Sequence, residues 1–215
     1  MSIRIMIADD HAMVRDGLKM ILEAANDMIV VAMAADGREA VALAAEFRPE
    51  VIIMDISMPG LNGIEATRQI HERLPAVRVL ILSMHHSQEH VCRALMAGAE
   101  GYLLKESAGS EVVTAVRTVM NGDRFFGNGV EQPVEVRNGA VHDIQKSPFD
   151  KLSTREREVL QLLAEGKNAK ETAYLLKISD KTIETHRSHF MKKLNTHSVA
   201  DLTKFAIREG LASLN

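Results

Sequence analysis

Val51-Ile52-Ile53-Met54-Asp55 is a run of four apolar residues that ends in a carboxylate. A short, continuous apolar run of this kind is typical of a strand buried on both faces of a parallel sheet. Comparable runs recur along the N-terminal half, separated by longer segments whose apolar residues have helical spacing. The predicted strands span residues 3–8, 29–33, 51–54, 77–82 and 101–104. This alternation predicts a doubly wound α/β fold, with a flavodoxin-like five-stranded parallel sheet in the order 2-1-3-4-5.

Charge and pattern divide the chain into two parts. Residues 1–147 hold 14 Lys and Arg against 20 Asp and Glu, whereas residues 148–215 hold 12 against 9, so the net charges are −6 and +3. Residues 122–148 lack sustained periodicity and contain repeated Asn-Gly and Pro turn signals, which is typical of a linker. We predict a first domain over 1–121, a linker over 122–148 and a second domain over 149–215. The positive charge of the second domain suits a partner with a phosphate backbone.

The composition excludes several classes of protein. With 46% hydrophobic and 26% charged residues, the chain has the balance of a folded, soluble protein. Its apolar runs are strand-sized, far short of the roughly 20 residues that a membrane-spanning helix needs. No leader-like segment precedes the first acidic residues, and the single Cys92 cannot form an internal disulfide. We therefore expect a cytoplasmic protein with no membrane partner.

Carboxylates gather where the predicted strands end. Asp9 and Asp10 follow the first strand, and Asp55 ends the third. In a doubly wound sheet the carboxyl ends of these two strands meet at the ligand-binding edge, so the three acids should share one pocket. Three carboxylates repel each other and favour a cation, and oxygen ligands beside a phosphate point to Mg²⁺. Ser83 and Lys105, at the ends of the fourth and fifth strands, add a hydroxyl and a positive charge to the same edge.

These residues resemble a receiver domain of two-component signalling, and the resemblance covers nearly the whole segment up to Lys105. The motifs that carry it are Asp9-Asp10, Asp55 followed by Met58-Pro59-Gly60, Ser83, Tyr102 and Lys105.

The resemblance implies that Asp55 accepts a phosphoryl group from a phosphohistidine of a partner sensor histidine kinase. It also implies that Asp10, Asp55 and the main-chain carbonyl of Ser57 hold Mg²⁺, while Asp9 acts through metal-bound water. Ser83 and Lys105 would contact the phosphoryl oxygens. Tyr102 would turn inward as Ser83 moves, which is the expected switch.

Four short helices are predicted in the second domain from their capping residues. Ser153 and Glu156 form a capping box, Asn168 can cap a second helix, and Ser179 and Ser198 can cap a third and a fourth. Only Lys177-Ile178-Ser179 separates the second helix from the third. Two short helices joined by so short a turn indicate a helix-turn-helix.

The second domain resembles the LuxR-type DNA-binding domain over about 60 residues. The motifs include residues 152–160, Ala164-Glu165-Gly166, residues 181–186 and Lys192-Lys193-Leu194. One face of the third helix is a polar and basic strip of the kind that enters a major groove, and it consists of Lys181, Glu184, Thr185, Ser188 and Lys192. The resemblance implies that Glu184, Thr185 and Ser188 face base edges. It implies that Lys181, Thr182, Lys192 and Lys193 hold phosphates.

Together the two resemblances identify the chain as a member of the NarL/FixJ family of response regulators. We expect a transcription factor rather than an enzyme, which binds double-stranded DNA and forms a homodimer when phosphorylated or bound to DNA. A second hypothesis keeps DNA binding but makes the first domain a dimerisation module that does not depend on phosphorylation.

Two enzymatic readings fit the sequence less well. A phosphatase or phosphomutase with Asp55 as nucleophile would have a second acid two residues later, where this chain has Ser57. A dinucleotide-binding domain would have a glycine-rich turn after the first strand, where this chain has Ala8-Asp9-Asp10-His11.

Overall fold

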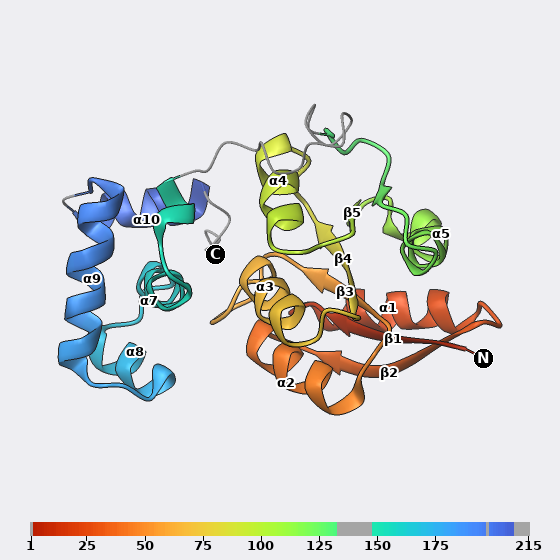
Figure 1. Cartoon of the computed structure of the whole chain (residues 1–215), viewed down its shortest axis with the longest axis horizontal. Coiled ribbons are helices and arrows are strands. Elements are labelled where there is room, and N and C mark those ends of the chain that lie inside the picture. Colours follow the sequence, from red (N-terminus) through yellow and green to blue (C-terminus); the bar gives the residue numbers. More distant parts are fainter. Residues whose placement is uncertain (1, 133–147, 197, 209–215) are drawn as a thin grey trace. The chain divides into compact units, whose positions relative to one another are not determined.

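The computed structural model describes residues 2–132, 148–196 and 198–208 (Figure 1). The chain divides into two compact units, Met1–Ile144 and Gln145–Asn215. The predicted linker over 122–148 lies partly outside the described residues, because residues 133–147 are not among them.

A parallel sheet forms the centre of the first unit. Its strands are β1 (Ile3–Ala8), β2 (Met28–Ala34), β3 (Val51–Asp55), β4 (Arg78–Ser83), β5 (Gly101–Leu104) and β6 (Phe125–Phe126). Their order is β2-β1-β3-β4-β5-β6, and every neighbouring pair is parallel. The doubly wound fold is thus confirmed, with one strand more than predicted. The extra strand comes from the segment predicted to be linker, and with two residues it is too short to show a periodic pattern.

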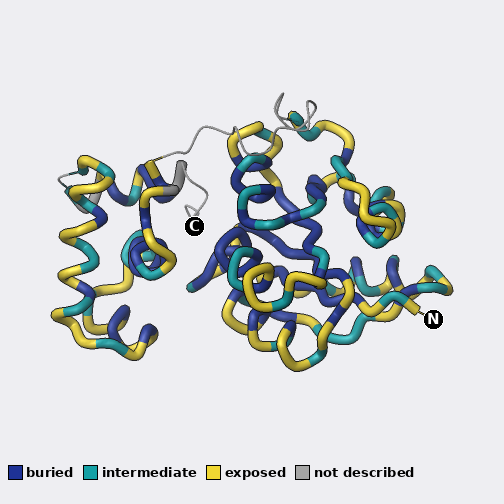
Figure 2. Tube along the Cα trace, in the orientation of Figure 1, coloured by how far each residue is buried: buried dark blue, intermediate teal, exposed yellow. Residues whose placement is uncertain are grey.

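Helices cover both faces of this sheet (Figure 1). They are α1 (Ala12–Glu23), α2 (Gly37–Phe47), α3 (Gly63–Arg73), α4 (Gln88–Met96) and α5 (Ala108–Met120). Helices α2, α3 and α4 pack on one face and α1 and α5 on the other, so the sheet separates two apolar cores. The central strands are therefore buried on both sides, as their continuous apolar sequence predicts (Figure 2).

The loop between β3 and α3 brings the end of β3 against the first turn of α3. Gly60 has a φ of 73°, a left-handed conformation that glycine adopts without strain. A Cβ atom on Gly63 would lie 1.8 Å from the carbonyl oxygen of Asp55, so only glycine allows this close approach. The loop geometry therefore fixes Asp55 at the carboxyl edge of the sheet.

The second unit is helical. After a short 3-10 turn (Pro148–Lys151) come α7 (Thr154–Ala164), α8 (Ala169–Leu176), α9 (Asp180–Leu194) and α10 (Val199–Arg208). The four predicted caps are confirmed, since the side chains of Ser153, Asn168, Ser179 and Ser198 each accept a hydrogen bond from a main-chain amide three residues later. Lys177 adopts a left-handed conformation with a φ of 53°, which turns the chain from α8 to α9.

The helices of the second unit enclose a core of their own, which includes Val159, Leu160, Ile183 and Phe190. The helix-turn-helix is thus held by packing within this unit. Within the described ranges, the protein has no helix of the length and apolar character required to span a membrane.

Candidate functional site

Two buried carboxylates face one lysine at the carboxyl edge of the sheet. Asp9 follows β1 and is fully buried, and Asp55 ends β3 with 1% of its surface exposed. Lys105 Nζ lies 2.8 Å from Asp9 Oδ2 and 3.0 Å from Asp55 Oδ2. Lys105 is held at this point because its main-chain amide donates to the carbonyl of Ser83. The structure therefore brings together the side chains of Asp9, Asp55 and Lys105, three of the five residues predicted to converge.

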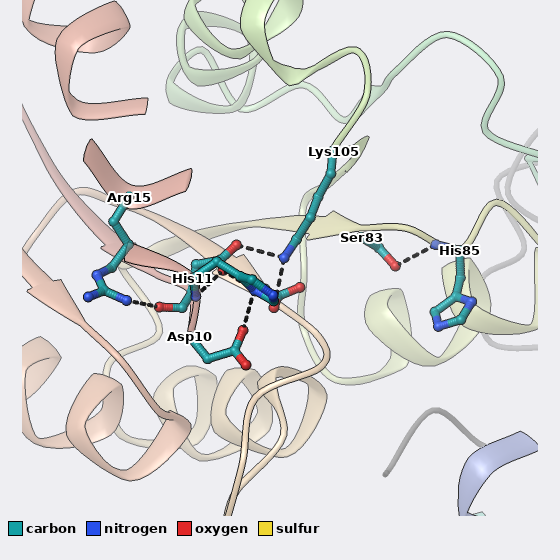
Figure 3. A network of polar contacts seen from close by, with 8 residues as sticks. Asp10, His11, Arg15, Ser83, His85 and Lys105 are labelled. Atoms are coloured by element: carbon teal, nitrogen blue, oxygen red, sulfur yellow. Dashed lines mark hydrogen bonds and ion pairs between the residues drawn. The ribbon is translucent and has the colours of Figure 1, made fainter. Parts of the chain in front are cut away.

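His11 is a member of this cluster that the sequence analysis did not single out. It lies just before α1, and its Nδ1 atom is 2.7 Å from Asp10 Oδ1 and 3.2 Å from Asp9 Oδ1 (Figure 3). Its main-chain amide also donates to Asp9 Oδ1 at 2.8 Å. Arg15 adds a hydrogen bond from its guanidinium to the Asp9 carbonyl at 2.5 Å. Nitrogen groups from the start of α1 thus hold Asp9 and Asp10 in place.

The environment of Asp55 disfavours its charged form. Burial, together with the nearby charge of Asp9, raises the pKa of Asp55 to about 6, although Lys105 and the main chain of Ser57 act in the opposite direction. Burial draws the pKa of Lys105 down, but the pull of Asp55 and Asp9 outweighs it, so the pKa of Lys105 lies above its ordinary value. Lys105 therefore stays charged, while Asp55 is a carboxylate that a further positive charge would stabilise.

This cluster can hold a metal ion. Ligand atoms of Asp9, Asp10, His11 and Asp55 all lie within 4.8 Å of one another. Asp9 and Asp55 share the charge of Lys105, while Asp10 lies against His11, and carboxylate oxygens at this density fit a hard divalent cation. The three predicted carboxylate ligands thus lie together, with an imidazole nitrogen added, while the main-chain carbonyl of Ser57 stays a prediction.

Ser83 and Tyr102 meet at the loop that follows β4. The hydroxyl of Ser83 accepts a hydrogen bond from the main-chain amide of His85 at 3.0 Å (Figure 3). The ring of Tyr102 is already fully buried, and its hydroxyl donates to the carbonyl of His85 at 2.7 Å. Burial raises the pKa of Tyr102 to about 12, so its hydroxyl keeps its proton and remains a donor. Both predicted switch residues therefore hold the same loop residue.

The predicted reading face of α9 is exposed. Its exposed residues are Lys181, Glu184, Thr185, Ser188 and Lys192, whereas Ile183 and Phe190 on the opposite face are fully buried. The hydroxyl of Thr185 donates to the carbonyl of Lys181 at 2.9 Å. Glu184 lies 3.8 Å from Arg187, one turn along the helix. Five of the seven predicted DNA-contacting residues thus point to solvent from one face.

The other two predicted contacts are engaged within the fold. Thr182 Oγ1 lies 2.8 Å from Ser179 Oγ at the start of α9. Lys193 Nζ lies 2.6 Å from Glu156 Oε2, although 41% of the Lys193 side chain is exposed. Glu156 is buried and also accepts from the main-chain amide of Ser153 at 2.8 Å. Lys193 therefore ties the end of α9 to the first turn of α7.

Replacing Lys193 with methionine is expected to lower the stability of the second unit by about 1 kcal/mol at neutral pH, because Glu156 loses its ion pair while buried. Burial acts to raise the pKa of Glu156, but Lys193 and Ser153 outweigh it and hold that pKa below its ordinary value. The ion pair therefore stabilises the fold at pH values above the ordinary pKa of a glutamate. This stabilisation disappears as the pH falls through the lowered pKa of Glu156.

Chemical denaturation at pH 7 and in acid measures this effect. Lys170→Met, at an exposed position on α8, is the matched control. If Lys193→Met lowered the stability of the second unit equally in acid and at pH 7, the effect would not come from the ion pair with Glu156.

Comparison with known proteins assigns both units. Residues 5–117 match the response regulator receiver domain, and residues 150–206 match the luxR family of bacterial regulatory proteins. The chain belongs to the response regulators with a LuxR-type DNA-binding domain. The prediction that it is a regulator and not an enzyme is confirmed by this assignment.

Relatives match this response regulator over two thirds of its length or more. The oxygen regulatory protein NreC of Staphylococcus epidermidis is 42% identical over 214 residues, which cover 97% of this chain and 98% of the relative. A LuxR-family two-component response regulator from Aurantimonas sp. is 36% identical, with a TM-score of 0.57 over 67% of this chain and 100% of that one. The RcsB response regulator in complex with DNA is 27% identical, with a TM-score of 0.55 over 96% of this chain and 98% of that one.

Proposed function

We propose that this response regulator is a cytoplasmic transcription factor whose DNA binding is switched by phosphorylation of Asp55. The observation that carries the proposal is the position of the Asp55 carboxylate, which is buried at the end of β3 and lies 3.0 Å from Lys105 Nζ. A carboxylate oxygen beside a fixed ammonium group is a nucleophile with a positive charge already placed for an incoming phosphoryl oxygen.

The phosphoryl donor that fits this site is a phosphohistidine of a partner sensor histidine kinase. An Asp55 oxygen forms a bond to phosphorus as the bond between phosphorus and the histidine nitrogen breaks, and the imidazole leaves. Such a transfer depends on in-line positioning and on neutralisation of charge more than on covalent help from the protein. Lys105 neutralises part of that charge, because it already contacts both Asp9 and Asp55.

The metal that the donor set favours is Mg²⁺. Asp9, Asp10, Asp55 and the main-chain carbonyl of Ser57 would hold it, and its charge would offset the oxygens of the phosphoryl group. Because the pKa of Asp55 is raised to about 6, a divalent cation would also favour the ionised, nucleophilic form of this carboxyl.

The output of the switch is binding of double-stranded DNA by α9. Lys181 and Lys192 would hold phosphates, and Glu184, Thr185 and Ser188 would face base edges, because all five are exposed on one face of α9. RcsB has been seen as dimers bound to DNA. A homodimer would present two copies of α9 to two half-sites, so we propose that phosphorylation favours dimerisation and raises affinity through the second half-site.

The proposal is tested with acetyl phosphate and Mg²⁺ as the phosphodonor system. Wild-type protein is expected to gain the mass of one phosphoryl group, to shift toward dimers and to bind DNA more tightly. Asp55→Ala is expected to gain no phosphoryl group and to show neither change. Asp16→Ala, at an exposed position on α1, should behave like the wild type. Mass spectrometry, light scattering and fluorescence anisotropy with a duplex selected by the wild-type protein measure the three effects.

The same experiment decides between the two hypotheses for the first unit. If wild type and Asp55→Ala dimerise and bind DNA alike after treatment, the receiver is a dimerisation module that does not depend on phosphorylation. That outcome would reject the switch while leaving the DNA-binding function intact.

A further inference from the structure

The start of the predicted linker is built into the first unit. The main-chain amides of Phe125 and Gly127 donate to the carbonyls of Glu100 and Tyr102, at 3.2 and 2.9 Å. Phe126 and Val130 pack against the apolar core beneath α2, α3 and α4, which also contains Tyr102. Residues 125–130 therefore leave the sheet edge along a defined path.

A carboxylate on α5 fixes this path from the other side. The main-chain amide of Asn128 lies 3.2 Å from both carboxylate oxygens of Glu111, and its side-chain amide also donates to Glu111. Ser107 orients Glu111 by donating its hydroxyl to Oε2 at 2.9 Å. The chain is thus held between α5 and the core up to Val130.

The next residue reaches the loop between β4 and α4. The main-chain amide of Glu131 donates to the carbonyl of His86 at 3.1 Å. His86 follows His85, whose amide donates to the Ser83 hydroxyl and whose carbonyl accepts from Tyr102. One short loop is therefore bonded on one side to the Ser83 hydroxyl, which would contact the phosphoryl group, and on the other side to the linker.

We propose that residues 84–87, termed the β4–α4 loop, are the docking site for the linker at Glu131 and transmit the state of Asp55 to it. This inference rests on the proposed function, because it names the route by which phosphorylation acts. The hydroxyl of Ser83 accepts a hydrogen bond from the main-chain amide of His85 at 3.0 Å, so the two groups cannot move far apart without breaking this bond. When that hydroxyl moves toward a phosphoryl group on Asp55, either the loop follows or this bond breaks.

Either movement alters the position of the His86 carbonyl that receives the linker. Tyr102 restrains the same loop through His85, so the loop has a small number of bonded arrangements rather than a continuum. The hydrogen bond of Glu131 is formed in one arrangement and weakened in the other. A loop with two arrangements couples Asp55 to the linker when both of these sites shift the equilibrium between the arrangements.

The test removes the donor that Glu131 offers to the loop. Glu131→Pro lacks a main-chain N–H and cannot bond to His86, whereas Glu131→Ala keeps that group and is the matched control. Tyr102→Phe keeps the aromatic ring but loses the hydroxyl that holds His85. All are studied as the full chain, with acetyl phosphate and Mg²⁺, and the extent of Asp55 phosphorylation is measured in each by intact mass.

The readout is the ratio of DNA affinity with and without phosphorylation. We expect this ratio to fall about fivefold in Glu131→Pro and in Tyr102→Phe, which corresponds to one hydrogen bond, while their phosphorylation stays at the wild-type level. Glu131→Ala should keep the wild-type ratio. Equal ratios in Glu131→Pro and Glu131→Ala, with both proteins folded by circular dichroism, would overturn the linker route alone. If phosphorylation does not change the DNA affinity of the wild type, the proposed function is overturned as well.

Discussion

Asp55→Asn is expected to stabilise the metal-free receiver at neutral pH by up to about 3 kcal/mol. Burial and the charge of Asp9 raise the pKa of Asp55 from 3.8 to about 6 even with Lys105 beside it. The folded state therefore holds a carboxylate less favourably than the unfolded chain does. An amide of the same shape removes this cost, because it carries no charge to desolvate or to repel Asp9.

The sign of the effect follows from where protons are bound. Between pH 4 and pH 6 the folded protein retains a proton on Asp55 that the unfolded chain has released, so wild-type stability falls as the pH rises through this window. Above it the full cost is present, and below it the cost disappears. The advantage of Asp55→Asn should therefore be largest near pH 7.5 and absent near pH 3.5.

Calorimetry of the full chain in EDTA measures this advantage. Asp16→Asn, on the exposed side of α1, is the control and should change the receiver transition little. Addition of Mg²⁺ should narrow the difference, because a cation that binds the wild-type carboxylates stabilises the folded state by mass action. An Asp55→Asn protein that is less stable than the wild type at pH 7.5 would show that the ion pair with Lys105 outweighs burial and repulsion.

The convergence of the acidic site could be predicted because it follows from topology. Asp9, Asp55 and Lys105 each stand at the carboxyl end of a strand, and neighbouring parallel strands bring those ends together whatever the details of packing. The caps of the second unit were equally predictable, since a capping side chain and its amide lie three residues apart in sequence. Local rules and sheet topology thus account for most of the fold and the core of the site.

Contacts between residues far apart in the sequence were not predictable. Lys193 was expected to hold a phosphate, but its partner Glu156 lies 37 residues earlier and is reached only because α7 packs on α9. The bond from Glu131 to His86 depends on a two-residue strand without a periodic signal.

His11 left a weaker signal. A lone histidine at the start of a helix is usually an ordinary surface residue. Only the position of His11, directly after two acids at the end of a strand, indicates that it belongs to the acidic cluster.

Lys192→Ala is expected to weaken binding to selected and random DNA alike. Lys192 is exposed on the same face of α9 as the residues proposed to face base edges, and the proposed dimer carries two copies of it. At about 1 kcal/mol for each phosphate contact, affinity should fall by roughly 30-fold, and the slope of log affinity against log salt should become shallower by about 2. Anisotropy titrations over a range of salt concentrations measure both quantities.

Lys193→Ala tests whether the effect of Lys192→Ala depends on the position of the lysine, because it removes the same charge from the next residue. The Lys193 ammonium is bound to Glu156. Its loss should therefore reduce the stability of the second unit, and it should change the salt slope less than Lys192→Ala does. Equal changes in slope for Lys192→Ala and Lys193→Ala would mean that Lys193 leaves Glu156 to contact DNA.

Thr185→Ala is expected to change which sequence is preferred while leaving affinity for random DNA nearly intact. The Thr185 hydroxyl donates to the Lys181 carbonyl, so its oxygen faces outward as an acceptor beside the methyl group. Acceptors suit the amino groups of cytosine and adenine, and the methyl group suits thymine. Loss of this side chain should relax discrimination at one base pair per half-site by about 1 kcal/mol. Selection from a random duplex library with both proteins measures the preference. An unchanged selected sequence, with weaker binding to every duplex, would reassign Thr185 to the backbone, because a contact that cannot tell bases apart is a contact to phosphate or sugar.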